Sequence, residues 1–93
     1  MHHQWTESDD LAALYVYKFG VGNLPYSQEE IAVRRGIKPG SFAMRIQNFQ
    51  ALDGKGGLDN FARQSKDIYE RYQHLSEADL RRIVFHELGT SSG

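Results

Sequence analysis

Apolar residues recur along the chain every three or four positions, which is the spacing of an amphipathic helix, and no segment shows convincing strand alternation. The first helical stretch begins after Thr6, which has a carboxylate three residues later as in a capping box, and it ends at Gly20. Its apolar positions are Leu11, Leu14, Tyr15 and Phe19. The pattern predicts a helix over about residues 8–19, preceded by a frayed segment over residues 1–5.

A second, shorter helix is predicted over about residues 28–35. Ser27 and Glu30 have the spacing of a capping box, in which each side chain bonds the backbone N–H of the other residue. Gly36 follows the helix and is able to adopt the left-handed backbone conformation that closes a helix tightly. A tight turn is therefore expected after this helix.

The third helix is predicted over about residues 41–52. Either Pro39 occupies its first turn or Ser41 caps it, since both residue types suit the start of a helix. One face is apolar and consists of Phe42, Ala43, Ile46, Phe49 and Leu52. We also assign Met44 to the core.

Two more helices are predicted in the last third of the chain. The first covers about residues 66–74 with Ser65 as its cap, and the second covers about residues 77–88 and ends at Gly89. Their apolar positions are Ile68, Tyr69 and Tyr72, then Leu80, Ile83, Val84 and Leu88. With a frayed tail over residues 90–93, the chain reads as one small all-α domain of about five helices.

The composition excludes several classes of protein. The chain has 93 residues and no cysteine, which excludes disulfides and cysteine-bound metal centres. No apolar run is long enough for a membrane-spanning helix, and no signal-peptide pattern is evident. We therefore expect a cytoplasmic protein with no membrane association.

The formal net charge of −1 conceals an uneven distribution. Residues 1–33 contain one base and five acids, a net of −4, and residues 67–93 contain three bases and five acids, a net of −2. Residues 34–66 contain seven bases and two acids, a net of +5. A local positive field of this kind is suited to a polyanion, although the bases are also explained by two solvated helical faces.

The second and third helices have the spacing of a helix-turn-helix pair. Ala32 is small enough to let the helices approach, Gly36 makes the turn, and Ile37 follows as a buried plug. Phe42 and Ile46 then anchor the third helix from beneath. The alternative is an ordinary helical hairpin that binds no nucleic acid.

This arrangement predicts a set of DNA contacts. Side chains on the outer surface of the third helix are suited to base edges, and bases around the turn are suited to phosphates. The candidates for the helix are Ser41, Arg45, Gln47 and Asn48. The candidates for phosphates are Arg34, Arg35, Lys38 and Lys55, with Arg63 and Lys66 extending the patch. For Arg45 an alternative stays open, namely an ion pair with an acid of the first helix.

Other chemistry finds little support. The glycine-rich loop of residues 53–57 lacks the hydroxyl residue and the preceding strand of a phosphate-binding Walker loop, so it either presents Lys55 to a phosphate or serves as a flexible connection. His74 and His86 have no metal-ligand pattern around them, and no catalytic nucleophile is evident. We expect no enzyme activity, no cofactor and no metal. Surplus aromatic residues, among them Tyr17, Tyr26 and Phe85, are candidates for a partner surface.

Residues 27–72 also carry a resemblance. The pieces are GSFAMRI over residues 40–46, NF over 48–49, LD over 52–53, GGL over 56–58 and IY over 68–69. This run resembles an N-terminal domain found ahead of HNH nuclease domains in restriction endonucleases. The resemblance implies a DNA-associated accessory module linked to restriction or mobile elements, without the nuclease. Double-stranded DNA is the expected partner, bound with a second copy or a protein partner. The alternative function is a small interaction or regulatory module that docks on a nuclease or another DNA-processing protein.

Overall fold

The computed structural model describes residues 4–52 and 63–85, and within these two ranges the chain forms five α-helices and no strand. They are α1 (Glu7–Phe19), α2 (Gln28–Arg34), α3 (Pro39–Leu52), α4 (Arg63–Tyr72) and α5 (Glu77–Val84). The prediction of a small all-α protein is confirmed for the part of the chain that is described.

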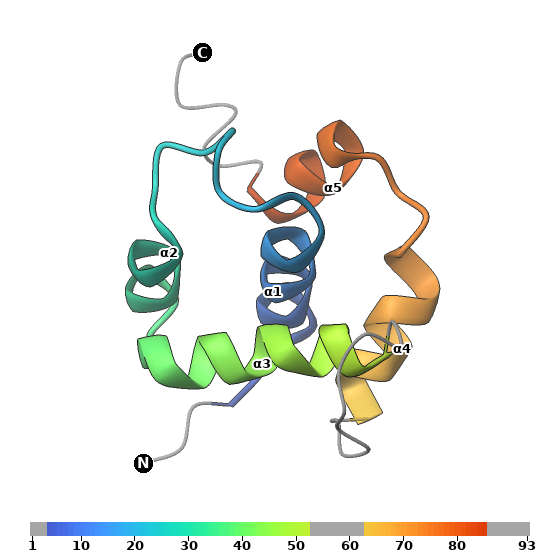
Figure 1. Cartoon of the computed structure of the whole chain (residues 1–93), viewed down its shortest axis with the longest axis horizontal. Coiled ribbons are helices and arrows are strands. Elements are labelled where there is room, and N and C mark those ends of the chain that lie inside the picture. Colours follow the sequence, from blue (N-terminus) through green and yellow to red (C-terminus); the bar gives the residue numbers. More distant parts are fainter. Residues whose placement is uncertain (1–3, 53–62, 86–93) are drawn as a thin grey trace.

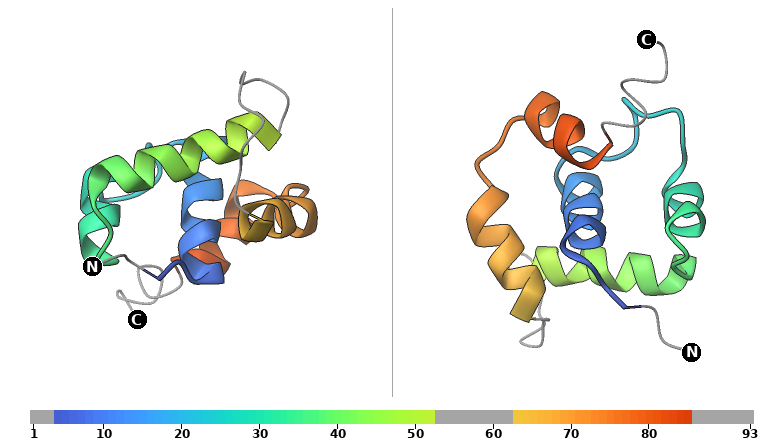
Figure 2. Two further views of the ribbon diagram at one scale, coloured as in Figure 1. Left: turned by 90° about the horizontal axis from the view of Figure 1, so that it is seen from below. Right: turned by 180° about the vertical axis from the view of Figure 1, so that it is seen from behind.

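The helix α1 lies at the centre, and the other four helices surround it (Figures 1 and 2). It packs against α3, α4 and α5, while α2 packs on α3 and α3 also contacts α4. Every residue from 9 to 16 is buried, so α1 is covered on all sides over these two turns. The largest fully buried apolar side chains come from α1, α3, α4 and α5 and are Leu14, Tyr15, Phe42, Phe49, Ile68 and Leu80.

The predicted capping boxes begin α1 and α2. Thr6 Oγ1 accepts a hydrogen bond from the Asp9 N–H at 3.1 Å, and Asp9 Oδ2 accepts one from the Thr6 N–H at 3.1 Å. Ser27 and Glu30 make the same reciprocal pair at 3.1 and 3.0 Å. Each box satisfies backbone N–H groups that have no partner inside the helix, which explains why these helices begin where they do.

The turn between α2 and α3 also has the predicted form. Gly36 has φ of 75°, in the left-handed region that favours glycine. The Ile37 N–H donates to the Ala32 carbonyl at 2.8 Å, and the Ile37 side chain is buried with 2% exposed. Pro39 occupies the first position of α3, so Ser41 lies inside the helix and does not cap it.

Several local predictions are wrong. Ser65 lies within α4 and is buried, so it is not the N-cap of this helix, and Trp5, in a segment expected to fray, packs against the core. Met44, expected in the core, is 68% exposed, and Ile83, expected on the apolar stripe of the last helix, is 47% exposed. Phe85, considered for a partner surface, is buried. The causes are tertiary, because helical spacing cannot show which face a neighbouring helix covers.

Parts of the predictions lie outside the described residues: the loop of residues 53–57 with Lys55, the segment 86–88 with His86, and the tail 90–93. No helix in the part that is described is long and apolar enough to cross a membrane.

Candidate nucleic-acid interface

The buried carboxylate of Asp10 binds Arg45. Asp10 is 0% exposed, and its Oδ1 accepts hydrogen bonds from Arg45 Nε at 2.7 Å and from Ser65 Oγ at 2.8 Å. Its Oδ2 accepts from Arg45 Nη2 at 2.9 Å and from Gln64 Nε2 at 2.6 Å. Two-point contacts between a guanidinium and a carboxylate are among the stronger hydrogen bonds in proteins. This cluster joins α1, α3 and α4.

Trp5 covers the guanidinium of Arg45. The Arg45 Cζ atom lies 4.4 Å from the centre of the Trp5 ring, and that ring stacks on Phe42 with centroids 6.5 Å apart. Only 15% of the Arg45 side chain is exposed. The prediction that Arg45 lies on the outer surface to contact bases is therefore wrong, and the alternative of an ion pair with the first helix is correct. An unpaired carboxylate at the position of Asp10 would carry a large desolvation cost.

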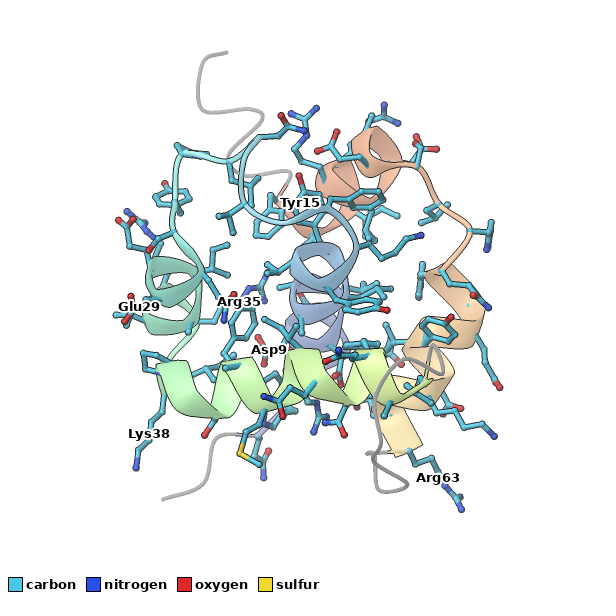
Figure 3. All side chains as sticks on the ribbon, in the orientation of Figure 1. Asp9, Tyr15, Glu29, Arg35, Lys38 and Arg63 are labelled. Atoms are coloured by element: carbon cyan, nitrogen blue, oxygen red, sulfur yellow. The ribbon has the colours of Figure 1, made fainter. Side chains whose placement is uncertain are left out.

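Arg35 is held in a similar way. Its Nη1 lies 3.0 Å from Asp9 Oδ1 and 3.1 Å from Ser8 Oγ, and its Nη2 lies 3.4 Å from the Val84 carbonyl. Its side chain is 20% exposed. Arg35 thus links the end of α2 to α1 and α5, and it lies between α2 and α1 in Figure 3. The predicted phosphate contact of Arg35 is not favoured by this geometry, because its guanidinium already bonds Asp9 and Ser8.

The remaining candidate cations that the structure describes are exposed, but they differ in the residues that they contact. Lys66 lies 3.9 Å from Glu70 one turn along α4, with 51% of its side chain exposed. Arg34 is exposed and stacks on Tyr26, with its Cζ 4.1 Å from the ring centre. Lys38 and Arg63 are exposed. None of Arg34, Lys38 and Arg63 makes an ion pair with another residue in the described ranges.

The face of α3 that points away from α1 carries no charge. Its exposed residues are Pro39, Gly40, Ser41, Met44, Gln47 and Gln50, which we call the outer face of α3. Asn48, a candidate contact, is only half-exposed and lies beside this face. Gly40, Met44 and Gln47 follow at four- and three-residue spacing and so form one stripe along the helix. The stripe is opposite the buried Phe42 and Phe49.

Two exposed cations lie next to α3 in the chain or in the fold. Lys38 directly precedes the helix, and Arg63 begins α4, which packs on α3. Figure 3 shows both side chains extending toward the same lower edge of the molecule, whereas Glu29 lies on the outer side of α2. Ser41 and Gln47 are thus exposed on α3, with Lys38 just before it and Arg63 on the adjoining α4, whereas Arg35 and Arg45 are mostly buried.

The partners of these arginines, Asp9 and Asp10, were not identified from the sequence. The sequence does indicate that Asp10 is unusual, because it precedes Leu14 by four residues and so lies on the apolar stripe of the first helix. An acid on such a stripe predicts a buried partner. The sequence does not say which of the seven bases of residues 34–66 provides it.

Shifted pKa values occur away from α3, between α1 and α5. Tyr15 is 1% exposed, and its hydroxyl donates to Glu77 Oε2 at 2.5 Å. Burial, followed by this hydrogen bond and the charge of Glu77, raises the pKa of Tyr15 to about 12. The hydrogen bond from Tyr15 lowers the pKa of Glu77. Among the residues that the structure describes, no three potential ligands come together as a metal site.

Comparisons with protein-family models, curated proteins and solved structures found no match to this chain. The resemblance to domains ahead of HNH nucleases, and the DNA association that it implies, stay predictions.

Proposed function

We propose that this protein is a non-enzymatic DNA-binding module in which α2 and α3 act as a helix-turn-helix pair. The observation that carries the proposal is the outer face of α3, which has no acidic residue, together with exposed Lys38 directly before this helix and exposed Arg63 at the start of the neighbouring α4. An α-helix fits the major groove of B-form DNA. An acid-free helix avoids repulsion from the phosphates on both sides of that groove.

The roles of the side chains follow from their exposure. Arg34, Lys38 and Arg63 are suited to phosphates because they are exposed and make no ion pair within the described residues. Lys38 is also next to the N-terminus of α3, where the helix dipole favours a negative group. Ser41 and Gln47 are suited to base edges. We assign Arg35 and Arg45 to holding the helices together and not to DNA.

One chain offers a small interface, so specific binding is proposed to involve a dimer or a protein partner. The resemblance to domains ahead of HNH nucleases supports a role in restriction or in mobile elements. In that setting the module directs a nuclease, or acts as a separate regulator at the same DNA.

The test is fluorescence anisotropy with a labelled random duplex at about 50 and about 200 mM salt. Three phosphate contacts give a slope of about −2.7 in log affinity against log salt, or roughly 40-fold weaker binding across this range. Replacing Lys38 and Arg63 by Glu should remove most of the binding. The control for each of these two replacements made singly is Arg82→Glu on α5, which lies on the far side of α1 from α3 (Figure 1) and pairs with Asp79 at 3.6 Å. Arg82 has the same charge and is 75% exposed.

Loss of binding in the Lys38 and Arg63 variants but not in Arg82→Glu supports the proposal. No binding at about 50 mM salt, or an equal loss in Arg82→Glu, would contradict it.

A second candidate function is docking on a protein. Val33 and Met44 are 65% and 68% exposed, which is high for large apolar side chains. The matching test is analytical ultracentrifugation of the protein with a nuclease or another DNA-processing partner. A stable complex that Val33→Asp disrupts, together with absence of DNA binding, would favour this candidate.

A further inference from the structure

The outer face of α3 has no arginine, and this limits the base pairs that it is able to read. Guanine is most often recognised by an arginine or lysine that donates to its O6 and N7 atoms. Arg45 is the only cation within α3, and its Nε and Nη2 atoms both donate to the Asp10 carboxylate. Lys38 precedes the helix and is assigned to a phosphate. The side chains available to the bases are therefore uncharged.

Met44 and Gln47 lie at the middle of α3 on this face, with Ser41 before them and Gln50 after them. They are three residues apart and hence neighbours on the helix, and Met44 is 68% exposed. A glutamine amide matches the N6 and N7 edge of adenine, and an apolar side chain fits the C5-methyl group of thymine. The N6 and N7 edge of adenine and the C5-methyl group of thymine occur on the same A·T base pair or on adjacent A·T pairs.

We infer that α3 reads A·T base pairs in the major groove, with Gln47 on adenine and Met44 against the thymine methyl group. This inference rests on the proposed DNA binding. Ser41 bonds either type of base and so adds little preference. The specificity-determining residues are Met44 and Gln47, while Lys38 and Arg63 contribute affinity at any sequence.

The experiment begins with selection of bound duplexes from a random pool, followed by sequencing. The selected site is then resynthesised with deoxyuridine in place of thymine, which removes the methyl group. Binding by the unaltered protein should weaken about fourfold, the factor for one buried methyl group. Met44→Ala should not respond to this change, and the matched control Ile83→Ala on α5, exposed on another helix, should respond like the unaltered protein.

A second series replaces adenine by 7-deazaadenine, which removes the N7 acceptor. The unaltered protein should lose about fivefold or more in affinity, and Gln47→Ala should lose nothing further. Gln73→Ala, the same change at an exposed position after α4, should behave like the unaltered protein. Circular dichroism of each variant checks that the fold is retained.

Different outcomes test the readout of A·T pairs and the proposed DNA binding itself. Selection of guanine contacts, binding without sequence preference, or equal deoxyuridine effects in Met44→Ala and the unaltered protein overturns the inference and leaves DNA binding intact. A G·5-methylcytosine pair keeps the methyl group of thymine but replaces adenine by guanine. If the protein binds this pair as tightly as A·T, Gln47 does not recognise adenine. Absence of binding to any duplex at about 50 mM salt overturns the proposed function itself.

Discussion

Removing the charge of Asp10 should destabilise the protein strongly. The carboxylate of Asp10 accepts four hydrogen bonds. Asp10→Asn keeps the size of the side chain, but the amide that results has only one acceptor oxygen. Arg45, with 15% of its side chain exposed, would then keep its charge in a buried position without a counter-ion.

The expected magnitude follows from this burial. Removal of one partner of a buried ion pair costs about 3–5 kcal/mol. Since Arg45 retains slight exposure and the amide oxygen still accepts, we expect the lower end, about 3 kcal/mol. This is a large part of the roughly 5–15 kcal/mol that stabilises a typical domain. The melting temperature should fall by roughly 12–24 °C.

The assay is urea unfolding followed by far-UV circular dichroism. Glu7→Gln is the matched control, because Glu7 lies 3.7 Å from Arg71 and both side chains are more than half exposed. It should cost about 0.5 kcal/mol or less. The double variant Asp10→Asn, Arg45→Met should recover part of the loss, since it leaves no unpaired buried charge at this site. A loss below about 1 kcal/mol in Asp10→Asn, or no recovery in the double variant, would refute the buried ion pair.

Three further predictions concern other contacts. Because the folded pKa of Tyr15 is raised from 10.0 to about 12, the folded state holds this proton more tightly, and the free energy of unfolding should fall between these pH values. Tyr15→Phe should remove that part of the slope in urea titrations, and an unchanged slope would contradict the raised pKa of the buried Tyr15 hydroxyl. Gly36→Ala should cost about 1–2 kcal/mol in the same assay, because a side chain at φ of 75° is strained although no atom lies within 4 Å of the added carbon. A neutral result would mean that the turn relaxes. Arg35→Ala should lower stability by about 1–3 kcal/mol in thermal unfolding, since Asp9 loses a charged partner. An effect no larger than that of Glu7→Gln would show that this link is not structural.

Local patterns were sufficient for most of the fold. Capping boxes at Thr6 and Ser27, the glycine at position 36 and the three- and four-residue apolar spacing predict the existence of each described helix. These signals involve residues close in the chain, so the backbone hydrogen bonds that they determine are visible in a short window. They also predict which side of α3 contains Phe42 and Phe49.

Only the tertiary packing decides which charged side chains are exposed and which form buried ion pairs. Residues 34–66 carry a net charge of +5, but Arg35 and Arg45 are taken up by acids 26 and 35 residues away in the chain. Helical spacing places Arg45 beside the apolar face of α3 without saying that α1 presents a carboxylate there. Whether an arginine contacts solvent or a buried acid is decided by the burial of that acid, because an unpaired charge in the core is too costly to remain. A count of charges along the chain thus overestimates the basic surface, and the candidate interface consists of the cations that packing leaves exposed.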